Sequence, residues 1–286
     1  MQRVMRPVFN TPGRSAIDAV ASFVGSYSLG LLVTNRIYNE GKYTKKEATI
    51  IATGFSTVSV TFMVVIANTL NLMDHWLLLF WTAFIVTFVA TLITIRIRPL
   101  KSISNEYAEN VEPKPEDVIT TNRFETAWKE AMETADAAPT FFVNIFDNLK
   151  DGLRMVMSIL PTILSIGLLG LVLAEYTLFF DIVGYIFLPV TYLLQAPEPL
   201  LTAKAAAVSI SEVFLPALLV ADVGADVATR FIVAVVSVSA VLFFSAMIPC
   251  ILATDIPIRI RDLVIIWFER VIISLIIVIP LANLLF

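Results

Sequence analysis

Long runs of apolar residues dominate this chain, and their lengths predict helices that cross a lipid bilayer. A bilayer core about 30 Å thick requires roughly 20 apolar residues in a helix. Four runs meet this requirement: Trp76–Ile95, Gly152–Ala174, Ala228–Leu252 and Leu263–Phe286. We therefore predict an all-α, polytopic transmembrane protein.

Three further apolar runs carry small and polar residues in their middle. The first is Ser15–Ile37, which contains Gly25, Ser26, Ser28 and Gly30. The second is Thr49–Leu70, which contains Gly54, Ser56, Thr57, Ser59 and Thr61. The third is Thr202–Val220, which contains Lys204, Ser209, Ser211, Glu212 and Pro216. Backbone that leaves the helix inside a bilayer is tolerated where it lines a cavity. The pattern predicts two re-entrant or discontinuous helix segments, which in transporters form the binding site near the midplane.

The two halves of the chain resemble each other weakly. Thr57–Phe62 and Ser209–Phe214 both place polar residues at alternate positions, and each half has an interrupted run followed by a clean span. We therefore predict an inverted repeat, with residues 1–98 and 152–286 as its two units. Residues 99–151 form a hydrophilic loop between them, with a surface helix at Arg123–Ala137.

Lysine and arginine are concentrated in a few loops, which sets the orientation by the positive-inside rule. They lie before Ser15, in Arg36–Lys46, in 96–154 and at Arg259 and Arg261, while the loops near Asp74, Glu175 and Asp222–Asp226 contain essentially none. We predict a multi-pass protein whose loop 99–151 is cytoplasmic. Both ends of Ser15–Ile37 are basic, so this run is expected to return as a re-entrant hairpin. Thr177–Leu194 and Pro199–Val220 either both cross or both return.

Composition supports this class and excludes others. The chain is 58% hydrophobic and 15% charged, with a mean hydropathy of +0.84 and a net charge of −4. The acidic balance argues against nucleic acid. A lone Cys250 and a lone His75 leave no disulfide and no convincing metal site, and hydrolase and phosphate-binding motifs are absent. We expect no enzyme activity and no cofactor.

Glu212 is the strongest single candidate for a solute contact, since a charge at membrane depth is costly and usually functional. It lies two helical turns from Lys204, so a structural Lys204–Glu212 ion pair is the alternative to a substrate or proton-coupling carboxylate. Tyr27 is expected to stack on an aromatic solute or to lie at the membrane interface. The predicted substrate-binding set is Glu212, Ser211, Ser209, Lys204, Tyr27, Ser28, Ser237 and Ser239.

Hydroxyl residues of the first half form a candidate cation site. Ser56, Thr57, Ser59 and Thr61 could offer hydroxyl and freed carbonyl oxygens to Na⁺, or could promote close helix packing. The same packing alternative applies to Ser237, Ser239 and Ser245. Asp18 and Glu47 have capping-box spacings with Ser15 and Thr44, which favours a role at helix starts over direct ligand contact. Arg270 is expected to pair with another span or to reach the interface.

Several motifs together resemble the nucleoside-recognition, or Gate, family, in particular YjiH-like bacterial inner-membrane proteins. They are Pro12–Asp18, Gly25–Gly30, Gly41–Thr44 with Glu47, Gly54–Ser59, Ser211–Phe214 and Thr254–Pro257. The family is similar to concentrative nucleoside transporters, the gate region of ferrous-iron transporter B and spore-maturation membrane proteins. The resemblance implies a hairpin, an unwound helix and a span, each occurring twice, in a protein of the inner membrane.

The resemblance also implies roles for single residues. Glu212 matches the hairpin glutamate that holds ribose hydroxyls, and Ser237, Ser239 and Ser245 would face the site. The first hairpin lacks the Gln-Thr-Glu cluster that reads the base, so the architecture transfers while the substrate does not. The motif starts close to Met1, so we expect either that a partner subunit supplies scaffold helices or that this is a minimal or split member of the family. The expected partner is a homologous or scaffold membrane subunit or a second copy of the chain.

We therefore expect a secondary transporter of a small polar solute, nucleoside-like or another metabolite, coupled to Na⁺ or H⁺. The alternative is a Gate-domain membrane subunit that does not transport and instead assembles with or regulates a partner membrane protein. An iron channel is disfavoured because cysteine, histidine and the scattered methionines supply no convincing metal path.

Overall fold

The computed structural model describes residues 1–109, 111–116, 123–137 and 139–286, and the secondary structure of these residues is helical throughout. The first half contains α1 (Gln2–Val4), η1 (Met5–Phe9), α2 (Ser15–Val24), α3 (Tyr27–Asn39), α4 (Lys45–Gly54), α5 (Val60–Thr69), η2 (Met73–His75), α6 (Trp76–Thr94) and η3 (Leu100–Ser102). The rest contains α7 (Arg123–Ala137), α8 (Phe141–Tyr176), α9 (Phe179–Gly184), α10 (Leu188–Leu193), α11 (Pro199–Val208), α12 (Leu215–Asp222), α13 (Val227–Ala240), α14 (Met247–Leu252) and α15 (Ile260–Leu285).

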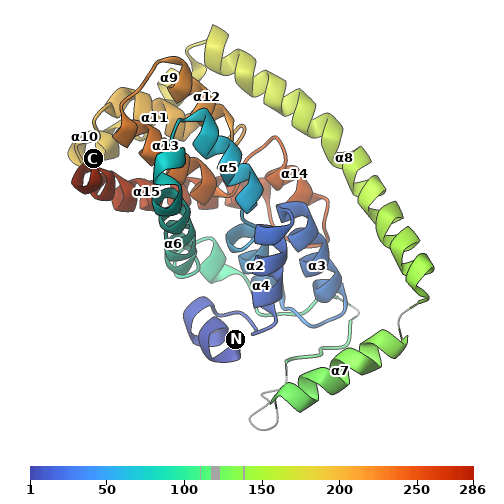
Figure 1. Ribbon diagram of the computed structural model, residues 1–286. Coiled ribbons are helices and arrows are strands. Elements are labelled where there is room, and N and C mark those ends of the chain that lie inside the picture. The colour runs from blue at the N-terminus through green and yellow to red at the C-terminus, as the bar shows by residue number, and fades with distance from the viewer. Residues whose placement is uncertain (110, 117–122, 138) are drawn as a thin grey trace.

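One order of elements occurs twice along the chain (Figure 1). The helix pair α2–α3 precedes the interrupted helix α4–α5 and the long helix α6. The pair α11–α12 precedes the interrupted helix α13–α14 and the long helix α15. The described chain thus contains the all-helical fold that the apolar pattern predicts, with a helix break in each half.

The first helix pair turns at Gly25, after which Ser26 caps α3 by accepting a hydrogen bond from the Leu29 amide at 3.3 Å. Gly30 lets the two helices approach closely, because a Cβ there would lie 1.9 Å from the Ser22 hydroxyl oxygen. A side chain at Gly30 would therefore force α2 and α3 apart.

The two helix breaks have local causes. The first covers residues 55–59 and ends where the Ser59 hydroxyl accepts a hydrogen bond from Phe62 N at the start of α5. The second covers residues 241–246, where Val241 has a φ of +64° that ends α13. Pro249 lies in the first turn of α14, where a missing N–H costs little. The prediction of an uninterrupted span over Ala228–Leu252 is therefore wrong.

Two described helices are long and apolar enough to cross a membrane: Met73–Thr94 and Ile260–Leu285. In α6, Ala83 is buried, whereas Leu77, Trp81 and Ile85 are 70%, 56% and 56% exposed. These three residues are spaced four apart and share one face. An apolar face of this kind suits lipid rather than water, and it agrees with a membrane location.

Helix α8 is longer than the predicted span Gly152–Ala174. Its 36 residues, Phe141–Tyr176, extend over about 54 Å at 1.5 Å per residue. Helix α7 begins and ends where the sequence predicted a helix, and its Trp128 is exposed. In Figure 1, α7 and the first half of α8 project away from the remaining helices.

Loops rich in lysine and arginine meet at one end of the molecule. The Glu116 carboxylate accepts hydrogen bonds from the amides of Gly13 and Arg14 at 2.8 and 3.1 Å, and Arg6 lies 3.6 Å from it. Lys45 lies 3.3 Å from Glu106 in an ion pair. The segment before α7 is thereby attached to the start of α2 and the α3–α4 loop.

The α3–α4 loop at this end also contains an ion pair of its own. Lys42 Nζ donates a hydrogen bond of 2.6 Å to Glu40, which lowers the pKa of the Glu40 carboxyl.

The C-terminal Phe286 contacts Phe231 and His75, so it lies beside the starts of α13 and α6.

Candidate functional site

The tip of the second helix pair is bonded to the second helix break. The amide of Phe244 donates to the Ile210 carbonyl at 2.7 Å, and the amide of Ser245 donates to the Ser211 carbonyl at 2.9 Å. These two bonds satisfy backbone groups that have left their helices. They hold residues 209–214 and 241–246 side by side in the centre of the fold.

Aromatic rings connect the two halves across this centre. Tyr27, which begins α3, lies edge-on to Phe243 of the second break, with ring centroids 5.8 Å apart. Phe62, next to the first break, lies edge-on to Phe214 of the second tip at 6.0 Å. Each tip thus contacts the opposite interrupted helix. We call this meeting point of tips 25–27 and 209–214 with breaks 55–59 and 241–246 the junction.

Glu212 lies at the junction and is partly buried. Its Oε2 accepts hydrogen bonds from the amides of Phe214 and Leu215, the latter at 2.9 Å, so it caps the start of α12. Lys204 instead bonds to Asp181 of α9 at 2.9 Å, so the predicted Lys204–Glu212 ion pair is wrong. The turn at residues 209–214 separates the two side chains.

The remaining predicted substrate residues use their hydroxyl groups for backbone or side-chain bonds. Ser209, Ser211 and Ser237 donate to carbonyls three residues earlier, and Ser209 also accepts from Trp267 Nε1 at 3.1 Å. Ser239 bonds to Ser274 at 2.8 Å, and Ser28 lies 2.9 Å from the Ser26 hydroxyl. The two tips contain Tyr27, Ser209 and Ser211. Ser28 follows the first tip in α3, and Ser237 and Ser239 lie within α13.

The predicted cation residues do not share one environment. Ser56 and Thr57 are buried in the first break, Ser59 caps α5, and Thr61 is exposed on α5. Among the described residues, Thr57 Oγ1 has no hydrogen-bond partner, and Ser245 Oγ of the second break has none either. Each break therefore contains a buried hydroxyl whose bonding capacity is unused.

Arg270 ties the two breaks together. This fully buried side chain of α15 donates to the carbonyl of Ser239 and, at 2.9 Å, to the Thr91 hydroxyl. Thr91 Oγ1 in turn lies 3.1 Å from the Gly54 carbonyl, where α4 ends. The expected pairing with another span is confirmed, and full burial excludes a position at the interface.

The two predicted capping carboxylates behave differently. Thr44 and Glu47 form the predicted capping box at the start of α4, with bonds of 3.2 and 2.8 Å. Asp18 does not cap α2, so that prediction is wrong. Its Oδ1 lies 2.8 Å from the Thr34 hydroxyl, and its Oδ2 accepts a hydrogen bond from Tyr43 at 2.7 Å, because α3 and the start of α4 cover it.

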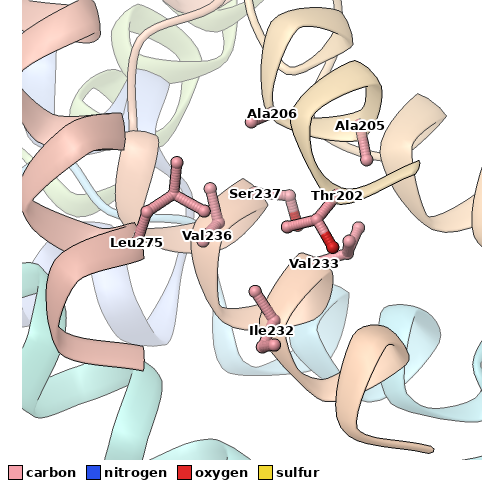
Figure 2. Close-up of a pocket in the computed structure, with 8 residues that line it drawn as sticks. All are labelled: Thr202, Ala205, Ala206, Ile232, Val233, Val236, Ser237 and Leu275. Atoms are coloured by element: carbon pink, nitrogen blue, oxygen red, sulfur yellow. The ribbon is translucent and has the colours of Figure 1, made fainter. Parts of the chain in front are cut away.

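Two interior spaces near the junction are narrow. Figure 2 shows one between α11 and α13, where Thr202, Ser237 and Leu275 face a space too tight for a water molecule. The other lies beside Thr57 and Phe23 and admits about one water molecule. A solute would require the surrounding helices to separate at both places.

Comparison with known proteins agrees with the motif resemblance. Residues 1–73, which contain the first helix pair and the first interrupted helix, match the family model Gate, described as nucleoside recognition. The full chain is 34% identical over 290 residues to an uncharacterized protein of Alkalihalophilus pseudofirmus, and it spans 62% of that relative's length. No solved structure matches the chain. The Gate match covers residues 1–73 of the chain, and the apolar helices agree with a membrane location.

Proposed function

We propose that this chain transports a small polar solute across the inner membrane through the junction, coupled to an ion. The observation that carries the proposal is the crossed contact of tips and breaks, in which Tyr27 meets Phe243 and Phe62 meets Phe214. Such a crossing puts unwound backbone of both halves in one place. Discontinuous helices of transporters use freed backbone groups and helix ends to hold substrates and ions.

In this proposal, residues 1–98 and 152–286 are inverted repeats and the two helix pairs are re-entrant hairpins. The lysine- and arginine-rich end of the molecule then faces the cytoplasm, together with the loop 99–151. The C-terminal Phe286 lies at the opposite, non-cytoplasmic side.

Unused polar groups support a ligand at the junction. Thr57 Oγ1 and Ser245 Oγ are buried without partners in the described chain, and buried polar groups are normally bonded. A solute with hydrogen-bond donors, or a cation that needs oxygen ligands, would bond to these two hydroxyl groups. Glu212 adds a carboxylate at the second tip, and the ring of Tyr27 at the first tip can stack on a planar solute.

Two narrow spaces support a closed conformation in this proposal. They admit about one water molecule or none, so a solute would enter there when a tip moves away from its opposing break. The two halves meet at the junction through the ring contacts Tyr27–Phe243 and Phe62–Phe214, whereas Arg270 anchors the helix ends behind it. The tips are therefore the parts expected to move.

A thermal-shift screen of the detergent-purified chain tests the proposal. Nucleosides, nucleobases, amino acids and small peptides are added in Na⁺ or K⁺ at two pH values. A ligand that binds only the folded state stabilises it by about 2.7 kcal/mol at a hundredfold excess over Kd. We expect one solute class to raise the Tm and Glu212→Gln to remove most of that rise.

Glu198→Gln is the matched control. Its carboxylate also accepts a backbone hydrogen bond, from Asp226 N at 3.2 Å, but lies away from the junction. The variant should keep the full solute response. A screen without any response, with a second membrane protein co-purifying at constant ratio, would contradict transport and support a subunit that assembles with a partner.

A further inference from the structure

Asp18 is a buried carboxyl group in the first helix pair that no contact at the junction uses. Its side chain is 1% exposed, and its two oxygens contact two hydroxyl groups: Oδ1 lies 2.8 Å from Thr34 Oγ1 and Oδ2 lies 2.7 Å from the Tyr43 hydroxyl. Among the described residues, no lysine, arginine or histidine forms an ion pair with it. A buried carboxylate without a cation is costly, and such a group tends to take up a proton.

The hydrogen atoms in this cluster can be counted. Thr34 Oγ1 lies within hydrogen-bond distance of both Asp18 Oδ1 and the Gly30 carbonyl, at 2.8 and 2.9 Å, but it has a single hydrogen. If Asp18 is protonated, its O–H donates to Thr34, Thr34 donates to Gly30, and Tyr43 donates to Oδ2. Each of the three contacts then contains one hydrogen. In the ionised form, one of the two Thr34 contacts would have none.

The charged groups around Asp18 are engaged elsewhere. On the N-terminal side of α2, Arg14 is paired with Glu116, which also bonds to the Gly13 amide. In the α3–α4 loop, Lys42 is paired with Glu40 and Lys45 with Glu106.

On α4, Glu47 is bonded to the Thr44 amide, so it does not face Asp18. Tyr43 is the titratable group in direct contact with the carboxyl. The N-terminal end of α2 favours the ionised form of Asp18, whereas burial opposes it.

We propose that Asp18 is a proton-binding site and that its proton is the coupling ion of the transporter. A proton from water bonds to one carboxylate oxygen to give the neutral acid, and separation of α2 from Thr34 and Tyr43 returns it to water. The inference rests on the proposed function for the coupling role. The cluster joins α2, α3 and the start of α4, so the charge state of Asp18 is linked to the position of the first tip relative to the first interrupted helix.

Infrared difference spectroscopy of the full chain in lipid tests this site without any solute. The carbonyl stretch of a protonated, buried carboxylic acid is recorded as the pH is changed from acidic to alkaline. We expect a band that disappears on deprotonation, is missing in Asp18→Asn, and persists in the control Asp74→Asn, whose carboxylate is exposed. A band unaffected by Asp18→Asn, or no band in the parent protein, would overturn the proposal.

Tyr43→Phe provides a second test that does not depend on the folding of Asp18→Asn. Removing the hydroxyl that donates to Oδ2 should raise the proton affinity about tenfold, since a charged acceptor gains more from a donor than a neutral one. The band should then persist to a pH about one unit higher, and an unchanged midpoint would contradict the site. If the carbonyl band of Asp18 is present but no solute raises the Tm, Asp18 binds a proton and the transport proposal is rejected. If a solute raises the Tm but the carbonyl band is absent, only the proton-binding role of Asp18 is rejected.

Discussion

The guanidinium of Arg270 donates two hydrogen bonds to the carbonyl oxygen of Ser239, 3.0 Å from Nε and 2.9 Å from Nη2. Ser239 lies in the last turn of α13, where carbonyl groups have no intrahelical donor. A cation at a helix C-terminus is also favoured by the helix dipole. Arg270 thus provides at the second break the positive charge and the donors that a bound cation or further helical turns would provide.

Replacing Arg270 with methionine should destabilise the protein by about 3 kcal/mol. The Ser239 carbonyl and the Thr91 hydroxyl lose their donor, and each buried group left unpaired costs about 1–3 kcal/mol. Unfolding by a denaturing detergent, followed by tryptophan fluorescence, measures the change. The control Arg261→Met removes an exposed arginine paired with Asp262 and should change stability by less than about 0.5 kcal/mol. Equal losses in both variants would show that Arg270 has no special role.

Two buried threonines near the first break should respond oppositely to replacement by valine. Thr57 Oγ1 has no partner among the described residues, so Thr57→Val should leave stability unchanged or raise it by about 1 kcal/mol. Thr91 accepts from Arg270 and contacts the Gly54 carbonyl, so Thr91→Val should cost about 2 kcal/mol. Thermal shift compares both variants with the parent protein.

The same pair separates stability from function. Thr57→Val should weaken the Tm response to the solute or the cation although the protein remains stable. The reason is that in the parent protein the ligand bonds to the Thr57 hydroxyl. A Thr57→Val protein with the full response would indicate that this hydroxyl is not part of the site.

Sequence patterns predicted most of the architecture because membrane helices have a clear length and polarity requirement. The helix pairs could be found from Gly25–Ser26 and from Ser209–Glu212, where small and polar residues interrupt apolar runs. The second break could not be found in this way. Residues 241–246 are almost all apolar, and the amides of Phe244 and Ser245, which have left the helix, bond to the second tip instead.

The sequence also did not predict the partners of the charged residues. Helical spacing placed Lys204 and Glu212 on one face, but the turn at 209–214 ends the helix between them. Asp18 had a capping-box spacing, yet its partners Thr34 and Tyr43 are 16 and 25 residues away. Such partners depend on helix packing, which local spacing does not report.

Attachment of the segment before α7 should depend on Glu116. Its carboxylate accepts from two amides at the start of α2 and lies near Arg6 and Arg14, so Glu116→Ala should loosen residues 111–116. We expect faster limited proteolysis of this segment in the purified protein. Glu112→Ala, which removes an exposed side chain of the same segment, should leave the rate unchanged. Equal rates in the two variants would show that the Glu116 carboxylate does not hold this segment in place.

Helix α8 approaches the second tip through Gly170, and two glycines of that helix give a matched test. A Cβ on Gly170 would lie 2.8 Å from the Ser211 Cβ, whereas nothing lies within 4 Å of a Cβ on Gly167. Gly167→Ala should therefore stabilise the protein by about 0.5–1 kcal/mol through helix propensity. Gly170→Ala should cost about 1–3 kcal/mol through overpacking and displace the tip. Because Ser211 holds the second break through its carbonyl, Gly170→Ala should also weaken any solute response, while Gly167→Ala should retain it. A stable Gly170→Ala protein with an unchanged response would show that α8 does not support the tip.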